Sequence, residues 1–88
     1  MKVIIQKIFE KDIHKISDKK LASLINDAIE EMEQTTKLTD LRNIKRMIAN
    51  GNYYRMRIGN YRLGFKVESN TITLLRFMHR KDIYKYFP

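Results

Sequence analysis

The side chains best suited to chemistry gather in residues 54–63, which read YRMRIGNYRL. Gly59-Asn60 separates two runs of alternating polarity and predicts a type II′ hairpin, because glycine readily adopts the positive φ of the first central position. A two-residue loop pairs Arg57 with Arg62 across this hairpin. Like charges directly opposite each other destabilise a sheet. We therefore expect the two guanidinium groups to hold an anion between them, and phosphate suits their planar geometry.

The same register places more basic side chains beside this pair. Arg55 and Lys66 share its surface, since side chains alternate between the two faces of a strand. Gly64 lies opposite Arg55 and leaves a low place where a backbone or base can approach closely. A basic face that serves only solubility is the alternative. Four cations without an acid favour an anion-binding surface instead.

His79 is the candidate general base. A two-residue turn at Ser69-Asn70 would put His79 on the face of Arg62, at the end of the sheet near Arg57. Neighbouring cations favour the neutral imidazole, which can accept a proton near pH 7. His14, by contrast, is expected at the surface of a short helix. Two histidines and no cysteine form no zinc motif, so no metal site is expected.

The charge distribution points to a polyanionic partner. The formal net charge is +8. Residues 1–50 carry 10 Lys/Arg and 8 Asp/Glu, whereas residues 51–88 carry 8 and 2. The positive excess therefore lies in the C-terminal half, where the arginine-rich hairpin is also found. A focused basic field of this kind steers a protein toward nucleic acid.

The elements that position these groups follow from local patterns. Residues 2–7 are expected to form a strand and 9–16 a short helix. A second helix is expected to run to about residue 34, with Ser17-Asp18 offering its N-cap. Residues 53–58, 61–68 and 71–78 are expected to form three strands, followed by the tail 79–88. Residues 37–52 are expected to form a short helix, marked by Leu41, Ile44, Met47 and Ile48, and then a loop. The order β-α-α-β-β-β predicts a single α+β domain, residues 1–88, with two N-terminal helices packed on a small antiparallel sheet.

Composition excludes several other classes of protein. No run of about 18 apolar residues is present, so no transmembrane helix is expected. The first residues, MKVIIQKIF, are too short and too interrupted for a signal peptide. There is no cysteine and no glycine-rich phosphate loop. We expect a cytoplasmic protein with no membrane partner and no small-molecule cofactor.

Two motifs resemble a known family. Residues 54–63 are similar to the YRxRxGxYRL signature of the RelE/ParE toxin superfamily, and residues 79–84, HRKDIY, resemble the HRxxxY ending of its RelE branch. The resemblance implies a RelE-like fold and a toxin of a type II toxin–antitoxin system, held inactive by a cognate antitoxin. It also implies a metal-independent endoribonuclease that cleaves messenger RNA in the ribosomal A site, through attack of the 2′-hydroxyl on the adjacent phosphate.

The resemblance also assigns roles to residues. It makes Arg62 the clamp for the transition state, Arg80 a catalytic cation, and Tyr84 a group that stacks on a base or assists proton transfer, with Tyr86 as its nearby substitute. His79 stands where some family members carry lysine. The basic side chains expected to contact RNA are Arg55, Arg57, Lys66, Lys45 and Arg46.

Two other functions remain open at this point. A ParE-like inhibitor of DNA gyrase keeps the fold but binds a protein and needs no RNA-cleaving groups. A non-catalytic module retained for binding the antitoxin is the second alternative. The grouping of arginines with His79 and Tyr84 favours the nuclease.

Overall fold

The computed structural model describes residues 1–47 and 51–88 of the chain. Its elements are β1 (Lys2–Ile5), α1 (Lys7–His14), α2 (Lys19–Gln34), the 3-10 helix η1 (Leu38–Asp40), β2 (Ile44–Arg46), β3 (Tyr53–Ile58), β4 (Tyr61–Glu68), β5 (Thr71–His79) and α3 (Ile83–Tyr86). The strands form one sheet in the order β1-β5-β4-β3-β2. Only the β1–β5 pair is parallel within the described ranges; the other neighbouring strands are antiparallel.

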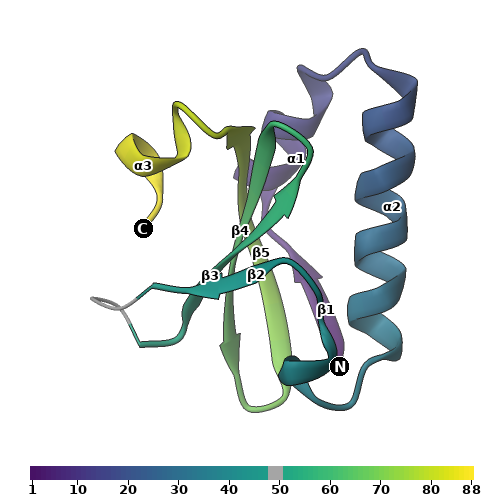
Figure 1. Ribbon diagram of the computed structural model, residues 1–88, viewed down its shortest axis with the longest axis vertical. Coiled ribbons are helices and arrows are strands. Elements are labelled where there is room, and N and C mark those ends of the chain that lie inside the picture. The colour runs from purple at the N-terminus through teal and green to yellow at the C-terminus, as the bar shows by residue number, and fades with distance from the viewer. Residues whose placement is uncertain (48–50) are drawn as a thin grey trace.

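The helices lie on two sides of this sheet (Figure 1). The long helix α2 covers one face, and the short C-terminal helix α3 lies on the opposite side. The N-cap predicted at Ser17-Asp18 forms, and Asp18 is the capping residue: its side chain accepts hydrogen bonds from the backbone N–H groups of Lys20 and Leu21 at 2.9 and 3.1 Å. The prediction of an α+β fold with two N-terminal helices packed on a mainly antiparallel sheet is confirmed.

The main core lies between α1, α2 and the inner face of the sheet. Its buried members are Phe9, Leu21, Ile25, Ala28, Met32, Leu41, Met56, Ile58, Leu63, Phe65, Ile72, Leu74 and Phe77. The side chains of β3 and β4 alternate between this core and the opposite face, as their sequences predict. The basic hairpin therefore turns its arginines away from the core.

Residues 37–52 differ from the prediction. The expected short helix is wrong for the described part of this segment, which contains the single turn η1 and then the strand β2. β2 pairs with β3 and places Lys45 directly across from Arg55. Three residues are too few to show the alternation that identifies a strand in a sequence. Residues 48–50, the remainder of the expected helix, lie outside the described residues.

A β-bulge interrupts the last strand. Phe65 pairs with Leu74, but the preceding residue of β4, Gly64, pairs with Arg76. Leu75 is therefore an extra residue in β5. Strict alternation from Thr73 would put Phe77 and His79 on the face of Arg62. The extra residue reverses this for all of β5 after the bulge, so these two side chains lie on the opposite face.

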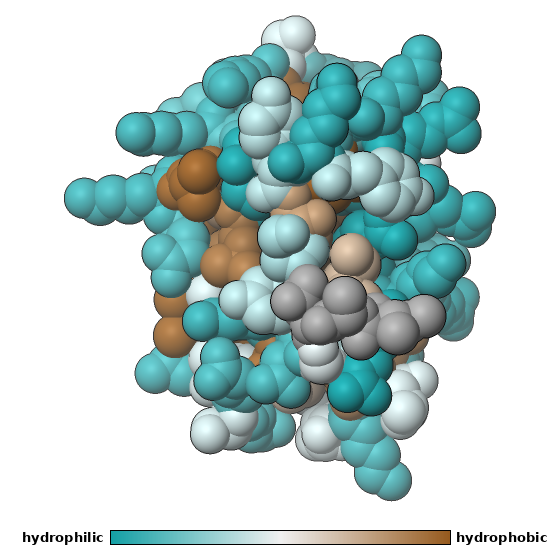
Figure 2. Space-filling model, turned by 90° about the vertical axis from the view of Figure 1, so that its left-hand side faces the viewer, coloured by the Kyte–Doolittle hydropathy of each residue, from teal (hydrophilic) through white to brown (hydrophobic). Residues whose placement is uncertain are grey.

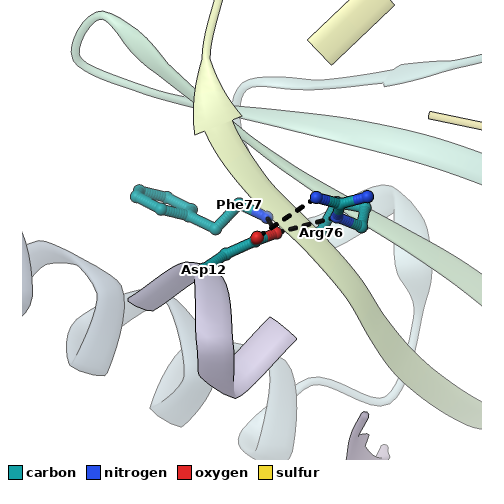
Figure 3. Close-up of polar contacts among 3 residues, drawn as sticks. All are labelled: Asp12, Arg76 and Phe77. Carbon is teal, nitrogen blue, oxygen red and sulfur yellow. Dashed lines mark hydrogen bonds and ion pairs between the residues drawn. The ribbon is translucent and has the colours of Figure 1, made fainter. Parts of the chain in front are cut away.

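A buried carboxylate stabilises the strand just after this bulge (Figure 3). β1 pairs with only the first half of β5, and α1 lies beside the second half. Asp12 of α1 is 5% exposed and accepts a hydrogen bond from the backbone N–H of Phe77 at 2.9 Å. Its two oxygens also accept from Nε and Nη2 of Arg76, at 2.8 and 3.2 Å. Asp12 thus provides the partner that a neighbouring strand would otherwise supply.

None of the helices in the described ranges is long and apolar enough to cross a membrane.

Candidate functional site

The basic hairpin forms in the predicted register. Gly59 has a φ of 59°, as its type II′ turn requires. Arg57 pairs with Arg62, and Arg55 pairs with Gly64. The two facing guanidinium groups therefore lie on the side of the sheet away from the main core. Figure 2 views the molecule from the α3 side, where hydrophilic side chains surround smaller hydrophobic patches.

A hollow of about 320 Å³ opens over this surface. The residues that line it are Asn43, Ile44, Lys45, Arg55, Arg57, Arg62 and Tyr84. They come from β2 and the residue before it, β3, β4 and α3. Four of the seven carry a positive charge, and none of the described residues that line it is acidic. The hollow, called the arginine pocket below, is therefore suited to an anion.

Local hydrogen bonds orient two of the arginines. Nη2 of Arg57 donates to the side-chain oxygen of Asn43 at 3.4 Å, and the backbone N–H of Arg57 donates to the Asn43 carbonyl at 2.9 Å. Nη1 of Arg62 donates to the carbonyls of Gly59 and Tyr61 at 3.2 and 2.8 Å. The hairpin turn thus fixes Arg62, while its other guanidinium N–H groups remain available to a ligand.

Arg55 has a different partner. Its guanidinium carbon lies 4.5 Å from the centroid of the Tyr84 ring, within the range of a cation–π contact. Among the described residues, Nη1 of Arg55 is buried without a hydrogen-bond partner. A buried donor without a partner costs free energy.

Tyr84 lies among the positive charges of the pocket. Hydrogen bonding and charge interaction with Arg55 lower the pKa of the Tyr84 phenol below its ordinary value, and the charges of Arg62 and Lys45 act in the same direction. Each cation favours the negatively charged phenolate. Tyr84 is 67% exposed, so a substrate can reach this residue. Tyr84 can therefore exchange a proton with a bound molecule.

The expected position of His79 is wrong. The second turn forms at Ser69-Asn70 as predicted, with positive φ at both residues. The extra residue Leu75 then shifts the register, so His79 pairs with Tyr61 and Met78 pairs with Arg62. His79 lies edge-on to the Tyr61 ring, 5.5 Å away between centroids. It faces the side of the sheet opposite to the arginine pocket.

The structure shows which of the two tyrosines, Tyr84 or Tyr86, belongs to the arginine pocket; the sequence could not distinguish them. Tyr84 lines the arginine pocket. The ring of Tyr86 lies 5.8 Å from the guanidinium carbon of Arg76 and contributes to another hollow, which it shares with His79. The two tyrosines thus lie on different sides of α3.

Three other basic residues expected at the site lie apart from it. Lys66 is at the far end of β4 and forms an ion pair with Glu68 at 3.4 Å, so that end of the face is not free of acid. Arg46 pairs with Tyr54, on the face opposite to Lys45, and its Nε donates to the Gly51 carbonyl at 2.7 Å. Arg80 follows β5, outside the lining of the arginine pocket in the described part of the chain.

Gly64 is not open to a ligand. A Cβ atom there would lie 2.7 Å from the ring of Phe87, so the C-terminal tail already fills the low place.

The sequence did not indicate the role of Asn43, whose side-chain oxygen accepts a hydrogen bond from Arg57. An asparagine in a loop is most often a turn residue, so the sequence alone gave little reason to assign it to the site. Asn43 does have the positive φ of a turn residue, 59°.

The pocket combines the parts of an acid–base site for phosphate chemistry. The guanidinium groups can bind the nonbridging oxygens, and Tyr84 can take or give a proton. Across residues 1–47 and 51–88, no group of three or more His, Cys, Asp or Glu side chains is arranged to hold a metal ion.

Comparison with known proteins agrees with this fold. A family model described as the ParE toxin of the type II toxin–antitoxin system parDE matches residues 3–84. Toxin RelE3 of Methanocaldococcus jannaschii is 44% identical over 89 residues, with all of both chains covered. A chain in the crystal structure of the RelB–RelE antitoxin–toxin complex from Methanococcus jannaschii is 38% identical, with a TM-score of 0.82 over 97% of this chain and 99% of that one.

A more distant structure shows the same fold. The archaeal RelE–RelB complex from Pyrococcus horikoshii contains a chain that matches with a TM-score of 0.74 at 20% identity, over 90% of this chain and 93% of that one. Fold and matches together define a toxin of a type II toxin–antitoxin system. The chain belongs to the RelE/ParE toxin family.

Proposed function

We propose that this toxin is a ribosome-dependent endoribonuclease that cleaves messenger RNA in the A site without a metal. The observation that supports this most strongly is the arginine pocket, which combines four cations with a tyrosine of lowered pKa and no acid among its described residues. A gyrase inhibitor needs no such grouping. The 44% identity to a protein named as a RelE toxin supports the same choice.

The reaction assigns one role to each group. Tyr84, as phenolate, accepts the proton of the 2′-hydroxyl, whose oxygen attacks the adjacent phosphorus. Arg57 and Arg62 stabilise the negative charge that grows on the nonbridging oxygens. The bond from phosphorus to the 5′-oxygen breaks, and the ammonium group of Lys45 donates a proton to that oxygen. The products are a 2′,3′-cyclic phosphate and a free 5′-hydroxyl.

The pocket is better suited to phosphate than to bases. Guanidinium and ammonium groups contact the RNA backbone and carry no sequence information by themselves. We infer that the ribosome selects the site of cleavage by presenting the message, and that free RNA is a poor substrate. Action on translating ribosomes also places the toxin in the cytoplasm.

A RelB-like antitoxin is the second partner in this proposal. Its support is the similarity to a chain of a RelB–RelE complex and an apolar groove between α1 and α2, lined in part by Phe9, Ile13 and Ile25. Ile5, which also lines this groove, is 43% exposed. In co-expression with the antitoxin encoded beside it, Ile5→Asp should weaken the complex, whereas an unchanged complex would place the contact elsewhere.

Primer extension on ribosomes programmed with a defined message tests the nuclease directly. Wild-type protein should cut within the A-site codon, and Arg62→Ala should cut at a rate lower by about a hundredfold or more, because one transition-state contact is lost. Arg46→Ala is the matched control, since Arg46 faces away from the pocket. Equal cutting of the same message without ribosomes would contradict the ribosome dependence.

No cutting by the wild-type protein would favour one of the other functions. The matching family model is described as a ParE toxin, so a gyrase supercoiling assay comes next. Inhibition of supercoiling would identify the ParE-like activity. A protein inactive in both assays that still bound its antitoxin would be the non-catalytic module.

A further inference from the structure

The C-terminal helix α3 sits over one row of residues that crosses three strands. In this row Arg55 of β3 pairs with Gly64 of β4, and Gly64 pairs with Arg76 of β5. Neighbouring strands lie about 4.8 Å apart. The two arginines therefore flank the glycine on either side. Each of the three residues of the row contacts an aromatic side chain of the C-terminal segment 83–87.

The central contact is between Gly64 and Phe87. A Cβ atom at Gly64 would lie 2.7–2.8 Å from three ring carbons of Phe87, so only glycine allows the ring to approach the sheet this closely. Phe87 is 4% exposed, and its ring lies 5.8 Å from that of Tyr53. Ile83, at the start of α3, is fully buried. Phe87 and Ile83 are absent from the main core cluster, because they lie on the other side of the sheet.

The two outer contacts are tyrosines on arginines. Tyr84 covers Arg55 at 4.5 Å, and Tyr86 lies 5.8 Å from Arg76, both measured from ring centroid to guanidinium carbon. Arg76 is in turn held by the buried carboxylate of Asp12. Arg76, which lies under Tyr86, is thus held by α1. Arg55, which lies under Tyr84, belongs to the arginine pocket itself.

The outer contacts are too weak to hold α3 alone. A cation–π contact at an exposed site is worth only about 0.5–1 kcal/mol, and Tyr84 and Tyr86 are 67% and 60% exposed. A helix of four residues has little stability of its own. The buried contacts of Phe87 and Ile83 must therefore hold α3 in place. Phe87 is the one of these two that depends on a particular partner, Gly64.

We propose that Phe87, seated on Gly64, is the positioning residue for Tyr84, and that this contact keeps the tyrosine over Arg55 in the geometry that RNA cleavage needs. The proposal rests on the function proposed above, in which Tyr84 takes the proton of the 2′-hydroxyl. Phe87 itself is not among the described residues that line the arginine pocket. Its effect on the reaction passes through the position of α3.

The test uses one readout that requires no catalysis. Protein labelled with ¹³C at tyrosine Cζ is titrated through alkaline pH by NMR, and the Tyr84 signal is assigned by its loss in Tyr84→Phe. In the wild type Tyr84 should titrate below the ordinary tyrosine value, because Arg55 lies beside it. In Phe87→Ala the titration should move up to the ordinary value. Phe87→Leu, which still fills the space over Gly64, should remain close to the wild type.

The second readout is single-turnover cleavage of message on ribosomes. Phe87→Ala should reduce the maximal rate by about a hundredfold, as a misplaced catalytic group does, with little change in the ribosome concentration that gives half the maximal rate. Phe87→Leu should recover most of that rate. Leu24→Ala, which truncates a 41% exposed apolar side chain of α2, is the matched control and should behave as wild type in both assays.

Gly64→Ala approaches the same contact from the other side. Its Cβ would displace the Phe87 ring, so it should raise the Tyr84 pKa and lower the maximal rate as Phe87→Ala does. Circular dichroism checks that the sheet is retained in each variant. This second variant keeps the proposal testable if Phe87→Ala fails to fold.

The outcomes separate this proposal from the proposed function. A Tyr84 pKa that stays lowered in Phe87→Ala overturns the positioning role, whatever happens to the rate. A raised Tyr84 pKa with an unchanged rate overturns the link between that position and cleavage. If the wild type does not cleave at all, the nuclease proposal fails, and the titrations alone still show whether Phe87 positions Tyr84.

Discussion

The guanidinium carbon of Arg55 lies 4.5 Å from the ring centroid of Tyr84, and both residues line the arginine pocket. The same arginine thus lowers the pKa of the tyrosine and adds positive charge to a surface suited to an anion. In the proposed reaction, phosphate binding and activation of the base are therefore coupled through one side chain.

Removing the positive charge of Arg55 should restore the ordinary protonation of Tyr84. In Arg55→Gln we expect the Tyr84 pKa to rise, because the largest of the interactions that favour the phenolate is lost. NMR titration of labelled tyrosine measures this change. Arg46→Gln removes a charge from the opposite face of β2 and should leave Tyr84 as in the wild type. A Tyr84 pKa that does not move in Arg55→Gln would show that other groups set it.

The rate of cleavage should increase with pH. If Tyr84 is the base, the active form is the phenolate, whose fraction grows until the pH passes the Tyr84 pKa. The lowered pKa brings this plateau to a lower pH than an ordinary tyrosine would give. In Arg55→Gln the inflection should therefore move to higher pH. Single-turnover rates on ribosome-bound message provide the profile, and the same profile in Tyr84→Phe would rule out this tyrosine as the base.

His79 should be dispensable for the chemical step. It lies beside Tyr61 on the face away from the arginine pocket, and its Nδ1 accepts a hydrogen bond from the Lys81 backbone at 3.1 Å. His79→Asn keeps a side-chain acceptor for that hydrogen bond and should cleave nearly as fast as the wild type. Tyr84→Phe should be slower by about a hundredfold or more, as loss of a general base predicts. The reverse order of the two variants would restore His79 as the base.

The salt dependence of binding should identify the cations that contact phosphate. Lys45 lines the pocket and its neighbour Arg46 does not. Lys45→Gln should make the slope of log K against log salt shallower by about 0.7 for a single-stranded contact, whereas Arg46→Gln should change it less. Titration of programmed ribosomes at several salt concentrations measures both slopes. Equal changes would mean that the charge of the protein as a whole, and not the pocket, governs binding.

Loss of the buried carboxylate should destabilise the fold. Asp12→Ala leaves the Phe77 backbone N–H and the partly buried Arg76 guanidinium without their shared partner. Breaking such a pair from one side costs about 3 kcal/mol or more. Urea unfolding should report this loss. Asp40→Ala, which removes an exposed acid from η1, serves as the comparison, and a loss of stability as small as that expected for Asp40→Ala would show that water replaces the buried bonds.

Local rules predicted much of the fold and part of the site. Glycine at the hairpin turn fixed the pairing of Arg57 with Arg62, because a two-residue loop leaves only one register. The helix that begins after Asp18 followed from its cap and its apolar stripe. These features depend on residues that are near in sequence. Lys45 lines the pocket, and its expected contact with RNA stays a prediction.

The errors arose where distant parts of the chain meet. No local signal in β5 marks Leu75 as an extra residue; the bulge is stabilised by Asp12, which is 63 positions away and is bonded to the residues that follow. Gly64 looked open because nothing nearby in the sequence indicates that Phe87 folds back over it. The burial of Asp12 could have been predicted from the sequence, because Asp12 lies three residues after Phe9 and therefore on the same, buried side of α1.

The bulge at Leu75 also has an evolutionary consequence. Because Leu75 is the extra residue, a strand that lacked it would keep Met78 opposite Arg62 and His79 opposite Tyr61. A strand of the present length paired without a bulge would instead put Phe77 opposite Arg62 and Met78 opposite Tyr61. A codon gained in this strand can thus be absorbed by a bulge, and the groups on each face of the sheet then stay the same while the strand length changes.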